Sequence, residues 1–126
     1  MPIYTYNEMC QRENRDGMQQ GMYANKNKNY SIVLLSGHDY VDTTVNDNMI
    51  KYSGTGKNQD QKYKGVNKSF KKFIDSPEAQ NGKHRDVRVY KRIKVNKWLY
   101  LGRYKLKTSC IEKENGYNVI KFYLEK

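Results

Sequence analysis

From Val87 onward the chain alternates apolar and polar side chains, which is typical of β-strands that bury one face. The segments 98–106 and 117–124 continue this pattern, and Asn115-Gly116 between them predicts a tight hairpin turn. The first alternating strand has Val87, Val89, Ile93 and Val95 on one face and Arg88, Tyr90, Arg92 and Lys94 on the other. The C-terminal part is therefore predicted to be antiparallel strands with one packed face and one basic face.

The rest of the chain predicts two more strands and at least one helix. The run YSIVLL, residues 30–35, indicates a buried strand that ends at Ser36-Gly37, and a second short strand is predicted over 49–52 after a polar loop, 43–48. Apolar residues recur at helical spacing between 64 and 74, and Ser76-Pro77 should end that helix. Residues 1–29 suggest a short helical start and a glycine-bounded loop.

These elements predict an α+β fold that is mainly β, with one or two flanking helices. The length of 126 residues fits a single domain over 1–126 with one hydrophobic core, and 1–11 is expected to form a loose N-terminal extension.

The charge of the chain points to an anionic partner. Lys and Arg number 24 against 13 acids, a formal net charge of +11. A membrane is disfavoured because the longest apolar run, 32–35, is far shorter than the roughly 20 residues of a spanning helix. The N-terminus has no apolar signal sequence, so we expect a cytoplasmic protein.

Catalytic and metal-binding patterns are missing. Cys10 and Cys110 have no C-x-x-C partner, and His38 and His84 are not spaced as zinc ligands. The acids Asp39, Asp42 and Asp47 lack calcium-loop spacing. We therefore expect free thiols, no catalytic residue, no metal and no cofactor.

Two short motifs could together hold a flat ring. Tyr40-x-Asp42 and Tyr52-Ser53-Gly54-x-Gly56 supply two aromatic faces, one carboxylate, and glycines that allow close backbone approach. The residues alone leave the alternative open that both motifs are ordinary strand ends and turns.

The order of these and other blocks resembles the SRA domain (SET- and RING-associated, also called YDG), particularly the bacterial versions attached to HNH endonucleases. The resemblance covers roughly residues 12–125. In the family's pattern, Ser53 stands in place of a threonine and Tyr100-Leu101-Gly102 in place of Tyr-Asp-Gly. The matching blocks are GMQQGM at 17–22, YSIVL at 30–34, the two tyrosine motifs, Gln59-Asp60-Gln61, Asn67, DVRV at 86–89, YLGRY at 100–104 and IKFYL at 120–124.

The resemblance implies a twisted PUA-like β-barrel that flips a modified cytosine out of duplex DNA. Tyr40 and Tyr52 would stack on the base, and Asp42 would accept its N4 amino group, with Asp39 as the alternative acid. The remaining base contacts would be Ser53, Ser36 and Gly37. Phosphate contacts are expected from Gln19, Gln20, Arg85, Arg88 and Arg92.

The partner implied is double-stranded DNA that contains 5-methylcytosine or a related base, as in a modification-dependent restriction system. No HNH-like histidine array is visible, so we expect binding without cleavage, with a nuclease domain or subunit as a further partner or the chain acting as a free-standing reader. Two other readings stay open: an RNA-binding PUA-like module, and a minimal nuclease that uses Asp39, Asp42 and Asp47.

Overall fold

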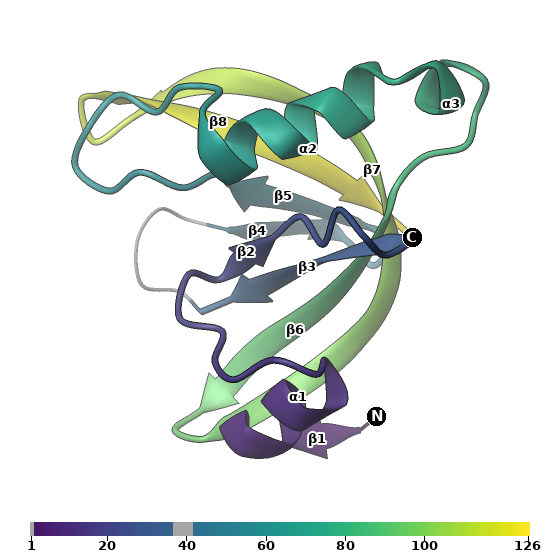
Figure 1. Cartoon of the computed structure of the whole chain (residues 1–126). Coiled ribbons are helices and arrows are strands. Elements are labelled where there is room, and N and C mark those ends of the chain that lie inside the picture. Colours follow the sequence, from purple (N-terminus) through teal and green to yellow (C-terminus); the bar gives the residue numbers. More distant parts are fainter. Residues whose placement is uncertain (1, 37–41) are drawn as a thin grey trace.

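The computed structural model describes residues 2–36 and 42–126, apart from the side chains of Thr43 and Thr44. Within these residues eight strands form one mixed sheet, accompanied by short helices (Figure 1). In chain order the elements are β1 (Ile3–Tyr4), α1 (Tyr6–Arg12), β2 (Met22–Tyr23), β3 (Tyr30–Leu35), β4 (Thr43–Asn46), β5 (Met49–Ser53), α2 (Gly65–Asp75), α3 (Pro77–Gln80), β6 (Asp86–Lys94), β7 (Lys97–Glu114) and β8 (Tyr117–Glu125).

The strands run in the order β2-β3-β6-β7-β8-β5-β4, and β1 adds to β7. Neighbours pair antiparallel except β3 and β6, which are parallel, so the sheet is mixed but mainly antiparallel, and the C-terminal strands pair antiparallel as predicted. The long strand β7 bends strongly and pairs with β6 along one part and with β8 along the other (Figure 1). This bending curls the sheet around its core, in agreement with the predicted mainly β architecture.

A bulge in the β6–β7 ladder changes which residues face inward. Val89 pairs with Gly102 and the next residue, Tyr90, pairs with Tyr100, so Leu101 is the extra residue. Gly102 has a φ of 107°, a conformation that favours glycine. The predicted alternation therefore fails beyond Val89, and Tyr90 is fully buried although it was expected on the basic face.

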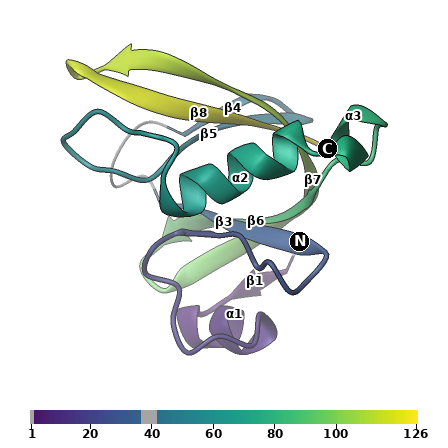
Figure 2. The ribbon, with the colours of Figure 1, turned by 45° about the horizontal axis from the view of Figure 1, so that its top comes forward.

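Helix α2 packs against the concave side of the sheet and closes the main core (Figure 2). The ring centroids of Phe70 on α2 and Phe122 on β8 lie 5.4 Å apart in an edge-to-face arrangement. Helical spacing predicted this element, and Ser76 ends it and caps α3 through a hydrogen bond from the Ala79 N–H. Other core side chains come from strands on both halves of the sheet: Val33, Ile50, Val87, Leu106, Ile120 and Leu124.

The N-terminal segment is packed, which corrects the expectation of a loose extension over 1–11. Thr5 and Glu8 form a capping box that starts α1, and Met9 and Cys10 on this helix are buried. These two side chains belong to a second apolar cluster that also contains Trp98 of β7. The short predicted helix thus gains its stability from tertiary packing, which local sequence patterns do not reveal.

A buried carboxylate ties this segment to the sheet. Glu13 is 2% exposed, and its two carboxylate oxygens accept hydrogen bonds from Nη1 of Arg88 at 2.9 and 3.0 Å. The Tyr90 hydroxyl also donates to Glu13, and burial together with this carboxylate raises the pKa of Tyr90. The Arg12 guanidinium lies 4.3 Å from the ring centroid of Tyr100.

Most predicted elements have the expected bounds. The strand over 30–35 is β3, the strand over 49–52 is β5, and Asn115-Gly116 forms the turn between β7 and β8. The prediction of a polar loop over 43–48 was wrong, because residues 43–46 pair with β5 as the edge strand β4. Both cysteines are free, and no helix of the described chain is long and apolar enough to cross a membrane.

Replacing Glu13 with Ala should lower the free energy of unfolding by about 3 kcal/mol, because it leaves the Arg88 guanidinium and the Tyr90 hydroxyl without their acceptor. Urea denaturation would measure this loss. Glu8→Ala, which removes an exposed carboxylate from the capping box of the same segment, should cost about 1 kcal/mol. Equal losses in the two variants would contradict the prediction, because the buried Glu13 carboxylate would then stabilise the fold no more than the exposed Glu8 carboxylate does.

Candidate functional site

A cavity of about 290 Å³ opens between the end of β3 and the end of β5. It brings together four predicted base contacts, Ser36, Asp42, Tyr52 and Ser53, from three segments of the chain. The predicted contacts Gly37, Asp39 and Tyr40 lie outside the described residues. The other lining residues are Gln19, Gln20, Gly21, Leu34, Gly54, Thr55 and Gly56.

Tyr52 anchors one wall of this cavity. The ring lies on β5, is 6% exposed, and also belongs to the main core. Its hydroxyl donates a hydrogen bond to the Gly21 carbonyl oxygen at 2.8 Å, which holds the 17–21 loop against the strand. The ring therefore has a fixed orientation, as a stacking platform requires.

Asp42 is held beside Ser53. Oδ1 of Asp42 accepts the Ser53 N–H at 2.8 Å. Burial raises the pKa of Asp42 to about 6, although hydrogen bonds from Ser53 and the charge of Lys121 favour the ionised form. Above this pH the cavity presents a carboxylate, which only accepts hydrogen bonds.

Behind Ser53 lies a buried ion pair that the sequence analysis did not anticipate. Lys121 on β8 is 2% exposed, and its Nζ donates to Oγ of Ser53 at 2.6 Å and to Oε1 of Glu114 at 2.9 Å. The β5–β8 register places Ser53 directly opposite Lys121. One signal was available in the sequence, namely a lysine inside the apolar run Val119–Leu124.

Two amide side chains hold the glycine-containing turn at the end of β5. Asn67 on α2 accepts the Thr55 N–H at 2.9 Å and donates to the Thr55 carbonyl at 2.9 Å. Gln61 donates to the Gly54 carbonyl at 2.8 Å and accepts the Ile120 N–H at 2.9 Å. These bonds make the 53–56 wall rigid, because each amide joins the turn to a regular element.

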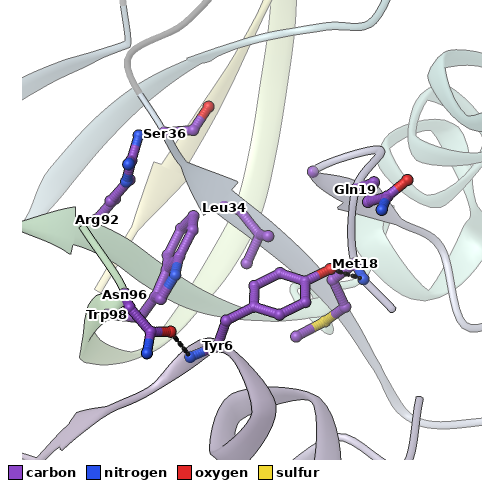
Figure 3. A pocket seen from close by; sticks show the side chains of 9 residues that line it. Tyr6, Met18, Gln19, Leu34, Ser36, Arg92, Asn96 and Trp98 are labelled. Atoms are coloured by element: carbon purple, nitrogen blue, oxygen red, sulfur yellow. Dashed lines mark hydrogen bonds between the residues drawn. The ribbon is translucent and has the colours of Figure 1, made fainter. Parts of the chain in front are cut away.

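A second cavity, of about 360 Å³, adjoins the first (Figure 3). The two cavities share Gln19, Gly21, Leu34 and Ser36. The side chains of Tyr6, Leu34 and Trp98 gather in its interior, and Arg92 lies beside Ser36 at one end. The Tyr6 hydroxyl oxygen accepts the Met18 N–H at 2.7 Å, which links α1 to the same loop.

The predicted phosphate contacts divide into two groups. Gln19, Gln20 and Arg92 line the cavities. Arg85 instead donates from Nη2 to the carbonyls of residues 24, 25 and 30 at 2.7–3.0 Å, and Arg88 binds Glu13. These internal bonds favour a structural role for Arg85 and Arg88, because they already engage Nη2 of Arg85 and Nη1 of Arg88.

The described residues contain no group of three or more His, Cys, Asp or Glu side chains that could hold a metal ion. The first cavity combines the Tyr52 ring, the Asp42 carboxylate with its raised pKa, and the rigid turn over residues 53–56. Such an arrangement can bind a planar group that carries a hydrogen-bond donor on its edge.

A family model described as the SAD/SRA domain matches residues 3–126. The chain belongs to the SAD/SRA family. Solved structures similar to it include the SUVH5 SRA domain in complex with fully methylated CG DNA, with 25% identity, a TM-score of 0.74, and coverage of 97% of this chain and 83% of that one. The complex of the same domain with hemimethylated CG DNA has 26% identity, a TM-score of 0.74 and the same coverage.

This SRA fold is also similar to that of the modification-dependent TagI restriction endonuclease. The identity is 18% and the TM-score 0.72, over 99% of this chain and 48% of that one, so this likeness concerns the fold alone. No curated protein matches the chain.

Replacing Asp42 with Asn should stabilise the free SRA domain at pH 7.5. The pKa of about 6 in the folded state exceeds the ordinary value of 3.8, so the folded state binds the proton more tightly and stability falls as pH rises through 4 to 6. The neutral amide removes this cost, about 3 kcal/mol at pH 7.5 for a pKa raised from 3.8 to about 6, and the gain should shrink towards pH 4.

Urea denaturation of both proteins at pH 7.5 and pH 4.5 would measure this difference. Asp47→Asn, which changes an exposed carboxylate in the β4–β5 turn, is the control and should show little change at either pH. A stability difference between Asp42→Asn and wild type that is equal at both pH values would contradict the assignment.

Replacing Gly54 with Ala should loosen the turn that forms the pocket wall. A Cβ at this position would lie 2.7 Å from Oδ1 of Asn67 and 3.0 Å from Oε1 of Gln61, so the amides that hold Thr55 must move. We expect a loss of roughly 1–3 kcal/mol and faster hydrogen exchange at the Thr55 amide. Gly17→Ala, whose Cβ would meet only the Tyr6 hydroxyl at 3.6 Å, should change neither quantity.

Proposed function

We propose that this SRA domain reads modified cytosine in duplex DNA by holding the base, flipped out of the helix, in the cavity between β3 and β5. The observation that carries the proposal is the Asp42 carboxylate, fixed by Ser53 at 2.8 Å beside the Tyr52 ring. Cytosine presents an amino donor at N4, whereas thymine presents an acceptor at the same position. A carboxylate therefore selects cytosine.

The base would stack on Tyr52 and, on its other face, on Tyr40. Each stacked aromatic face contributes about 1–3 kcal/mol, which helps to offset the few kcal/mol of unpairing. Asp39 stays the alternative acid, and Ser36 and Gly37 are proposed to meet the base through their backbone.

The hydrogen bonds of the rigid turn suggest how the base is oriented. The N–H groups of Ser53, Gly54 and Thr55 donate to Asp42, Ile120 and Asn67, so this wall offers none of these three donors to cytosine O2 or N3. We therefore place the O2 edge towards Ser36 and the C5 edge, which needs no donor, towards Gly54–Gly56. A methyl group there adds only about 1–3 kcal/mol of selectivity.

Binding of the surrounding DNA would rest on charge. The net charge of +11 supports phosphate binding with a steep salt dependence. Gln19, Gln20 and Arg92, which line the two cavities, are the proposed contacts of the described chain nearest to the flipped nucleotide.

A nuclease domain or subunit is the proposed further partner, by analogy with the modification-dependent TagI endonuclease. Such a module would act on DNA in the cytoplasm. The RNA-binding alternative has weaker support, because the SUVH5 SRA complexes named above contain methylated DNA.

Competitive binding at fixed salt tests this function. Wild type should prefer a duplex with one 5-methylcytosine over the plain duplex and over single-stranded RNA, and Asp42→Asn should lose at least tenfold in affinity for the methylated duplex, about 1.4 kcal/mol. Asp47→Asn is the matched control and should bind as wild type does. Equal affinity of wild type for all three nucleic acids would reject the modified-cytosine reader.

A further inference from the structure

We propose that Lys121 is a positioning residue for base recognition, and that with Glu114 it orients the Ser53 hydroxyl against the Asp42 carboxylate. This inference rests on the proposed function, because it concerns the same pocket. Lys121 is not a base contact in this scheme; it acts through Ser53.

The geometry places the ammonium directly behind the pocket wall. Lys121 pairs across the β5–β8 ladder with Ser53, and its Nζ lies 2.6 Å from Oγ of Ser53. Glu114, near the far end of β7, accepts a second hydrogen bond from the same Nζ at 2.9 Å. The lysine is only 2% exposed, so its ammonium group relies on hydrogen bonds to Ser53 and Glu114 in place of water.

The chemistry of these groups determines the direction of the hydrogen bonds. A lysine ammonium can only donate, so Oγ of Ser53 must accept from it. The single hydroxyl proton of Ser53 is then directed to another acceptor, and Asp42 is one, because its Oδ1 already lies 2.8 Å from the Ser53 N–H. Ser53 thereby holds the Asp42 carboxylate in place, and the lone pairs that Ser53 does not use are left to accept a hydrogen bond from the base.

The same arrangement sets the charge at the pocket wall. Among the described residues, the charged groups acting on Asp42 are Lys121 from β8, which lowers its pKa, and Glu114 from β7, which raises it. Burial is the main cause that raises the pKa of Asp42 to about 6, and the charges of Lys121 and Glu114 act on it in opposite directions. Removing one partner should move that titration in the direction set by the charge that remains.

A structural role alone explains this pair poorly. Val119, two residues before Lys121 and on the same face of β8, is fully buried, so an apolar side chain would suit this part of the sheet. Burying a lysine costs several kcal/mol of desolvation, and a buried ion pair is often no more stable than an apolar replacement. The hydrogen bond from Lys121 to Ser53, a side chain that lines the pocket, supplies a reason for a lysine at this position.

The test combines three variants with two measurements. The titration of the Asp42 carboxyl carbon, followed by NMR in the DNA-free protein, should shift upward by about one pH unit in Lys121→Met and downward in Glu114→Gln. Lys121→Arg, which keeps the charge, should titrate close to wild type. Unchanged titration of Asp42 in both charge-removing variants would overturn the proposal.

The second measurement is the affinity for a duplex with one 5-methylcytosine, relative to the plain duplex, between pH 5.5 and 8.5. The wild-type preference should fall as the pH drops through about 6, and the midpoint should move up in Lys121→Met and down in Glu114→Gln. An equal loss of preference at every pH, with no change of midpoint, would indicate a merely structural pair and count against the proposal.

The two measurements separate this proposal from the proposed function. If wild type shows no preference for the methylated duplex, the reader function fails, while the NMR titration still decides whether Lys121 and Glu114 control Asp42. If Lys121→Met does not fold, Glu114→Gln and Lys121→Arg remain, and the downward shift in Glu114→Gln with none in Lys121→Arg is the deciding result.

Discussion

The pocket depends on the antiparallel register of β5 and β8. This register places Ser53 opposite Lys121, so a strand that supplies the pocket wall is backed by a strand that supplies a buried cation. A shift of one residue would turn the lysine to the other face of the sheet and leave Ser53 without its donor. The tight turn at Asn115-Gly116 fixes the register of β8 with β7, the strand that supplies Glu114.

A second constraint joins the N-terminal segment to the pocket. The Glu13 carboxylate holds Arg88 and Tyr90 of β6, and the loop that follows it reaches Gly21, whose carbonyl accepts the Tyr52 hydroxyl. The chain between these two anchors carries Gln19 and Gln20 to the mouth of the cavity. The packed N-terminus therefore contributes to the site as well as to stability, which a loose extension could not do.

Sequence patterns predicted the parts of the fold that depend on local spacing. The β3 run, the period of α2 and the turn signal at Asn115-Gly116 all lie within a few residues of chain and appear as expected. Patterns failed where partners are distant: residues 43–46 become a strand only by pairing with β5, and Tyr90 is buried because Leu101 bulges on the neighbouring strand. Arg85 and Arg88, which the resemblance implied as phosphate contacts, also bind acceptors from segments more than 50 residues away, and no local pattern could show those partners.

The sequence by itself determined the mainly β class, the basic character and the candidate set of Asp42, Tyr52 and Ser53, because composition, periodicity and motif order are properties of the chain alone. The tertiary structure decided which of these side chains share one cavity and how they are charged. Burial raises the pKa of Asp42 and a lysine from another strand opposes that shift, and both effects act through space between residues that are far apart in sequence. The sequence shows Lys121 only as a lysine within an otherwise apolar run. Its position behind Ser53 follows from the pairing of β5 with β8.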